Sequence, residues 1–165
     1  MPTLTPRFTN FIDSASTRII TRVEVEASPD EVWQVIANNE RWPEWFPAAK
    51  ACRTTSPQAE GIGATRWIHF DLFKVNERFV AWDRPRRWAF TILDANVPGA
   101  VSVVEQALTE PLEGGKTALT YVYAADWASW ARPVVPILRW RLARLFREGL
   151  AGIQGQVAKL RQEST

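Results

Sequence analysis

Apolar and polar residues alternate along most of the chain between residues 48 and 125, as in strands that bury one face. The same alternation occurs earlier, in residues 17–27. The intervening segments carry Pro, Gly and Asp, which predict turns, and their shortness favours an antiparallel meander. The expected strands are residues 17–27, 48–55, 64–70, 73–82, 87–93, 101–109 and 117–125.

Three segments instead carry helical signals. Ser28, Pro29 and Glu31 form a capping box that predicts a helix over residues 29–37, and a second short helix is expected over 40–46. Residues 133–161 predict one long helix, about 43 Å in length. Its apolar stripe consists of Val134, Val135, Leu138, Leu142, Leu145, Gly149, Ile153 and Leu160.

This order of elements predicts an α+β fold in which a curved seven-stranded antiparallel sheet grips the long C-terminal helix. The 165 residues, 46% of them hydrophobic, suit one globular domain over residues 17–162. Residues 1–16 are expected to form a partly docked arm, and residues 163–165 a short tail. Such a sheet and helix leave a hollow between them, where we expect the functional site.

Cysteine and histidine counts exclude much familiar chemistry. One cysteine, Cys52, rules out an internal disulfide and favours a reducing, cytoplasmic compartment, as does the absence of a signal-like apolar run at the start. One histidine, His69, rules out paired-histidine metal motifs. The alternation places His69 on the outer face, which argues against a Cys52–His69 dyad.

Charge is concentrated near the C-terminus, where residues 128–165 contain seven Lys or Arg and two Asp or Glu. Arg139, Trp140, Arg144 and Arg147 lie opposite the apolar stripe. They predict either a peripheral contact with a membrane or a protein, or a solvated helix face. Nucleic-acid binding is disfavoured because no aromatic stacking face accompanies the arginines.

Strand alternation also places two opposite charges inside the hollow. If residues 71–72 form the turn between two strands, Arg66 lies directly opposite Glu77 on faces that are otherwise apolar. Charges in such positions predict an internal ion pair, which serves either the structure alone or a ligand.

Other inward positions complete the expected pocket. Tyr121 and Tyr123 offer two phenols, Glu105 could face either side of its strand and is assigned inward, and no metal ligands are expected. The candidate catalytic residues are Glu77, Arg66 and Tyr121. The candidate ligand-binding residues are Trp42, Trp45, Phe46, Arg66, Ile68, Phe70, Val75, Glu77, Phe79, Trp88, Phe90, Ile92, Tyr121, Tyr123, Trp130, Val134, Leu138 and Leu142.

The run VEVEASPDEVWQVIANNERWPEWFP at residues 23–47 resembles the opening of the polyketide cyclase/dehydrase and lipid-transport families of the START-like (SRPBCC) superfamily. Similar motifs follow at Gly61–Ala64, Glu77-Arg78, Trp82-Asp83 and Gly114–Thr117, so that the resemblance covers about residues 17–162. It implies the helix-grip fold, but this superfamily contains cyclases, lipid carriers, hormone receptors and co-chaperone-like modules.

Two pocket functions are therefore expected first. One is binding of a hydrophobic ligand, such as a lipid, an isoprenoid or a polyketide, without a cofactor, by a monomer or weak dimer. The alternative is a polyketide aromatase/cyclase or dehydratase with Glu77, or less favourably Glu105, as base, and Arg66 with Tyr121 or Tyr123 as enolate stabilisers. Catalysis ranks second because an adjacent arginine lowers the pKa of Glu77. A co-chaperone-like role of the basic helix ranks third.

Overall fold

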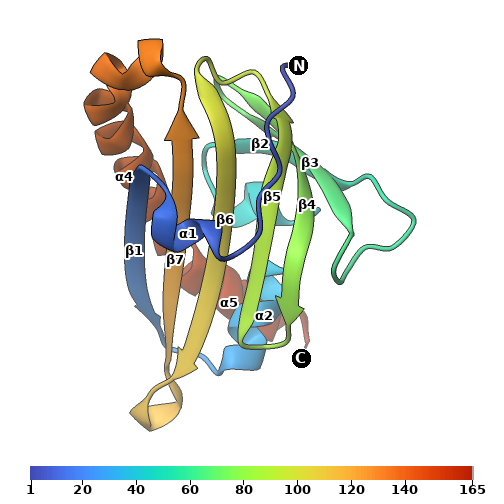
Figure 1. Cartoon of the computed structure of the whole chain (residues 1–165). Helices are drawn as coiled ribbons and strands as arrows, with labels where there is room; N and C mark the ends of the chain where they lie inside the picture. The colour runs from blue at the N-terminus through green and yellow to red at the C-terminus, as the bar shows by residue number, and fades with distance from the viewer. Residues whose placement is uncertain (165) are drawn as a thin grey trace.

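The computed structural model describes residues 1–164, so of the predicted C-terminal tail Thr165 lies outside the described residues. Seven antiparallel strands form one curved sheet in the order β1-β7-β6-β5-β4-β3-β2 (Figure 1). This confirms the expected α+β meander, with strand ends shifted by up to two residues. The strands are β1 (Thr17–Val25), β2 (Ala49–Thr54), β3 (Thr65–Phe70), β4 (Lys74–Asp83), β5 (Arg87–Ala95), β6 (Ala100–Pro111) and β7 (Thr117–Trp127).

Two short helices connect β1 to β2, and the longest helices follow β7. Ser28 accepts a hydrogen bond from the Glu31 N–H, and the Glu31 carboxylate accepts one from the Ser28 N–H, so the predicted capping box starts α2. None of the helices within residues 1–164 has the length and apolar character that a membrane span requires. The helical elements are α1 (Phe11–Ser14), α2 (Pro29–Ile36), α3 (Trp42–Trp45), η1 (Glu113–Gly115), η2 (Ser129–Val134), α4 (Val135–Ala151) and α5 (Ile153–Glu163).

The expected single helix over 133–161 is wrong in two respects. It begins at Val135, after the 3₁₀ turn η2, and it is divided at Gly152 into α4 and α5. Gly152 lies against α3 so closely that a Cβ atom there would overlap the carbonyl oxygen of Trp45. The division lets α5 turn across the sheet toward α2, so that two helices cover the concave face (Figure 1).

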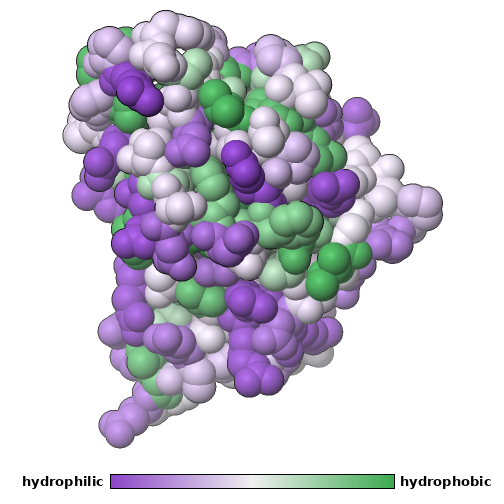
Figure 2. Space-filling view, viewed as in Figure 1, coloured by the Kyte–Doolittle hydropathy of each residue, from purple (hydrophilic) through white to green (hydrophobic). Residues whose placement is uncertain are grey.

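Residues 6–16 of the N-terminal arm lie on the opposite, convex face of the sheet (Figure 1), whereas residues 2–5 lie between the ends of β5 and β6, where these strands no longer pair. Leu4 and Thr5 donate backbone hydrogen bonds to the carbonyls of Leu93 and Val101. Phe11 and Ile12 of α1 pack in an apolar cluster with β6 and β7. Green apolar atoms stay visible among purple polar ones on this face in Figure 2, so the arm covers it only in part.

Candidate functional site

The buried ion pair predicted from the strand register is present. Arg66 of β3 lies opposite Glu77 of β4 in the sheet, and Arg66 Nε donates to Glu77 Oε2 at 2.6 Å. The two side chains are 0% and 2% exposed. A pair so fully removed from water stays charged only because each partner supplies the counter-charge of the other.

Further contacts hold Arg66 in place. Its Nη1 donates to Asn39 Oδ1 at 3.2 Å, and its guanidinium carbon lies 4.1 Å from the ring centroid of Trp42 and 4.7 Å from that of Phe90. Within residues 1–164, Arg66 Nη2 has no hydrogen-bond partner. Arg66 is therefore enclosed by aromatic faces, which attract cations, and is 0% exposed.

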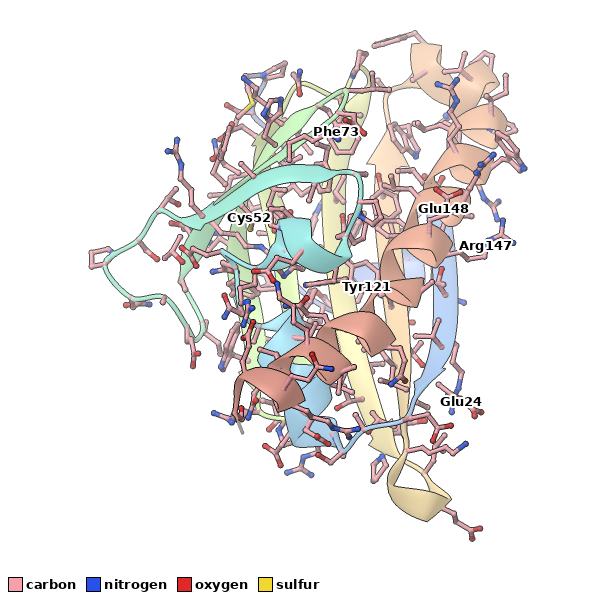
Figure 3. The ribbon with its side chains drawn as sticks, turned by 180° about the vertical axis from the view of Figure 1, so that it is seen from behind. Glu24, Cys52, Phe73, Tyr121, Arg147 and Glu148 are labelled. Atoms are coloured by element: carbon pink, nitrogen blue, oxygen red, sulfur yellow. The ribbon has the colours of Figure 1, made fainter. Side chains whose placement is uncertain are left out.

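A cavity of about 90 Å³ lies between the sheet and α4. In Figure 3, Tyr121 lies on the sheet behind α4, and Phe73 lies nearer the upper end of the strands. The wall is almost entirely apolar, with two carboxyl groups and two phenols. The lining residues are Leu4, Trp42, Phe46, Phe70, Phe73, Val75, Glu77, Phe90, Ile92, Ala95, Val97, Ala100, Val103, Glu105, Tyr121, Tyr123, Trp127, Leu138, Leu142, Leu145 and Phe146.

Glu105 is the second buried carboxyl group of this wall. It faces inward, as the strand alternation was read, and the Tyr121 hydroxyl donates a hydrogen bond to Glu105 Oε2. Burial and the nearby charge of Glu77 raise the pKa of Glu105 to about 8. Glu105 is therefore mostly protonated at neutral pH and can offer a hydrogen bond.

Of the two buried carboxyl groups, only Glu77 is paired with a cation. Burial also raises the pKa of Glu77, but Arg66 opposes this shift by attraction and by a direct hydrogen bond. With Arg66 and Glu77 charged and Glu105 protonated, the group of three is neutral. Burial likewise raises the pKa of Tyr121 and Tyr123, so both phenols keep their protons.

The predicted ligand-binding residues fall into three groups. Five of them are buried but do not line the cavity: Trp45, Arg66, Ile68, Phe79 and Trp88. Trp130 and Val134 are 68% and 54% exposed and lie outside it, which corrects their assignment. The η2 turn directs Ala131 inward in their place. The residues that line it are Trp42, Phe46, Phe70, Val75, Glu77, Phe90, Ile92, Tyr121, Tyr123, Leu138 and Leu142.

Several lining residues were not predicted. Phe146 follows Leu142 by one helical turn and lies 5.0 Å from Tyr121 and 5.6 Å from Tyr123 between ring centroids. Its helical spacing could have identified it. Leu4 lines the cavity from the N-terminal arm, a segment without any periodic signal.

The described residues provide neither an activated cysteine nucleophile nor a metal site. Burial raises the pKa of the Cys52 thiol to about 12, and Cys52 is paired with Ile68 in the sheet while His69, the next residue along β3, lies on the other face. Residues 1–164 contain no group of three or more side chains that could hold a metal ion.

Proteins similar to this chain are known from several bacteria. An uncharacterized protein of Mycobacterium tuberculosis is 27% identical over 143 residues, which cover 84% of this chain and 85% of that protein. Among solved structures, a START superfamily protein from Mycobacterium smegmatis matches with a TM-score of 0.73 at 14% identity, covering 87% of this chain and 98% of that one. An aromatase/cyclase from a Streptomyces species matches at 0.71 and 19%, covering 87% and 94%.

These structural similarities show the START-like fold. The family model described as "Polyketide cyclase / dehydrase and lipid transport" matches residues 16–158, which is most of the chain. The chain therefore belongs to the polyketide cyclase/dehydrase and lipid transport family.

Proposed function

We propose that this protein binds a hydrophobic small molecule that carries an uncharged oxygen, such as a hydroxyl or carbonyl group, in the cavity beneath α4. The observation that carries the proposal is the charge arrangement of the wall. No lysine, arginine or histidine lines the cavity within the described residues, and Arg66 is already paired with Glu77. A ligand carboxylate would thus be buried beside two glutamates without a cation.

Glu105 and the two phenols supply the complementary polar contacts. Protonated Glu105 and the hydroxyl of Tyr123 can each donate to an oxygen of the ligand, while the remaining wall receives its apolar body. This is the usual composition of a small-molecule site, which has many apolar walls and few placed polar groups.

The cavity is too small for a drug-sized ligand, so its wall must move when such a ligand enters. Pockets that enclose drug-sized molecules measure about 300–1,000 Å³, several times the volume found here. Leu138, Leu142 and Leu145 of α4 are only half-buried, whereas Phe146, Gly149 and Leu150 are buried. The first half of α4 is therefore the part of the wall that can move outward at the smallest loss of packing.

The test compares two ligands that differ only in the head group. A long-chain alcohol and the fatty acid of the same length are titrated at neutral pH and followed by tryptophan emission. The alcohol should bind at least tenfold more tightly. Native mass spectrometry of the freshly purified protein should show an uncharged apolar molecule. Tighter binding of the acid, or no binding of either, would overturn the proposal.

A second candidate function is proton transfer on a carbonyl ligand such as a poly-β-ketone. The observation that favours it is Glu105, which faces the cavity without a cation and has a pKa near 8. The geometry favours Glu105 over Glu77 as the base, because Glu77 is held by Arg66. Turnover lost in Glu105→Gln but kept in Glu77→Gln would support this activity. No turnover by the unmodified protein would exclude it for that substrate.

A further inference from the structure

Large apolar side chains are exposed on the outer side of η2 and the first half of α4. Trp130, Val134, Ile137 and Trp140 are 68%, 54%, 63% and 60% exposed. They recur every three or four residues, which places them along one side of the segment. Pale and green atoms predominate at the upper left of Figure 2, where Figure 1 shows the start of α4.

Arginines surround this apolar row. Residues 129–147 contain five arginines and no acidic residue. Among them Arg144 is paired with Glu148, and within residues 1–164 no ion pair holds the other four. Figure 3 shows Arg147 on the side of α4 that points away from the sheet. The four unpaired arginines are Arg132, Arg139, Arg141 and Arg147.

The row lies at one end of the cavity. Ile137 precedes Leu138, which lines the cavity, and Trp130 lies beside Gly99 in the β5–β6 turn. The β3–β4 turn is at the same end of the sheet, and its Leu72 is 80% exposed while the adjacent Phe73 lines the cavity. Exposed apolar groups and the apolar interior are therefore separated by one layer of side chains.

We propose that η2 and the outer side of α4 form a membrane-docking surface, with Trp130, Val134, Ile137 and Trp140 entering an anionic bilayer and the unpaired arginines of both elements contacting lipid phosphates. Aromatic and aliphatic groups bordered by arginine are typical of helices that lie in the membrane interface. Each arginine near an anionic surface contributes about a fivefold gain in affinity.

Charge and location together favour a bilayer over a protein partner. The unpaired cations match a negatively charged surface of broad extent, and both tryptophans have an amphipathic ring suited to the headgroup region. Docking at this end would bring the movable part of α4 into the bilayer, from which a hydrophobic ligand could pass into the cavity. The docking itself does not depend on the proposed ligand, since it uses only outward-facing side chains.

Co-sedimentation with vesicles tests the surface. The unmodified protein should bind vesicles of phosphatidylcholine mixed with phosphatidylglycerol, bind vesicles of phosphatidylcholine alone at least tenfold more weakly, and dissociate as salt is added. Ile137→Ser and Trp140→Ser should each weaken binding to the anionic vesicles about tenfold. Arg139→Glu combined with Arg147→Glu should weaken it more.

Matched controls lie elsewhere on the chain. Ile62 is 67% exposed in the β2–β3 loop, so Ile62→Ser makes the same change at similar exposure. Arg86→Glu combined with Arg87→Glu makes the same change of charge at exposed positions. These controls should leave vesicle binding unchanged.

Three results would overturn the proposal. They are no binding to the anionic vesicles, equal losses in the control and test variants, and self-association that Trp140→Ser abolishes without any vesicle binding. The last would identify the surface as a protein interface. Circular dichroism of each variant verifies that the fold is kept.

Discussion

The concave face of the sheet has two halves that are built differently. In the packed half, Arg66 lies among aromatic rings, and Gly149 and Gly152 bring the C-terminal helices into direct contact with Phe46 and Trp45. In the cavity half, α4 rests on the sheet through half-buried leucines. The packed half holds the sheet and helices in a fixed arrangement, which allows the other half to keep an interior that is not filled.

The same contrast applies to the two buried glutamates. Both line the cavity, but Glu77 has a guanidinium partner, while Glu105 has only the hydroxyl of Tyr121. A paired buried charge is suited to structure, whereas a buried carboxyl group without a cation changes its protonation state readily. The difference favours a structural role for Glu77 and, under the proposed function, a role in ligand contact or chemistry for Glu105.

The largest expected effect comes from breaking the ion pair. Glu77→Ala leaves the Arg66 guanidinium buried without its counter-charge, and should lower the free energy of unfolding by about 4 kcal/mol. Arg66→Met combined with Glu77→Leu removes both charges and should cost much less. Urea denaturation of the three proteins measures the difference. Equal losses in the single and double variants would mean that packing, not charge, determines the cost.

The next effect concerns the dependence of stability on pH. The folded protein holds the proton of Glu105 up to about pH 8, while the unfolded chain releases it near pH 4.5. The free energy of unfolding should therefore fall by about 3.5 kcal/mol as the pH rises from 5 to 8, which is most of the roughly 5 kcal/mol that the full change in pKa gives at about 1.4 kcal/mol per pH unit. Glu105→Gln should remove most of this slope. An unchanged slope in that variant would assign the titration to another group.

A smaller effect is expected where α4 meets α3. A methyl group at Gly149 would overlap the ring of Phe46, so Gly149→Ala should cost about 2 kcal/mol through overpacking. Gly155 of α5 provides the control, because within the described residues nothing lies near its added Cβ. Gly155→Ala should instead stabilise the protein by up to about 1 kcal/mol. Thermal unfolding of both variants compares them, and a neutral Gly149→Ala would show that this contact is loose.

The alternation of apolar and polar residues was sufficient to predict the strands of the sheet and the Arg66–Glu77 ion pair. The register through residues 71–72 placed Arg66 opposite Glu77, because side chains on adjacent strands face the same side in fixed pairs. The inward direction of the two tyrosines came from the same alternation, whereas the alternation allowed either face for Glu105, which the structure places inward. Asn39, the second hydrogen-bond partner of Arg66, could not be predicted, since it comes from a loop without periodicity.

Helical periodicity gave less reliable predictions at the C-terminus. It extends through Gly152 without interruption, because the break depends on contact with Trp45, far away in the sequence. It also predicted that Val134 points inward. Val134 is instead exposed, because the chain there forms a 3₁₀ turn with a different period. Contacts between distant segments decided both outcomes, and a single sequence does not display them.

Filling the cavity is the most direct test of whether a hydrophobic ligand binds beneath α4. Leu138 lines the cavity, so Leu138→Trp places a large ring in the space proposed for the ligand, while Ile62→Trp adds the same ring to an exposed loop. Binding of the long-chain alcohol is measured by native mass spectrometry for both variants, with circular dichroism to verify the fold. Leu138→Trp should weaken binding at least tenfold, and Ile62→Trp should leave it unchanged. Equal affinity in the two variants, both folded, would contradict binding beneath α4.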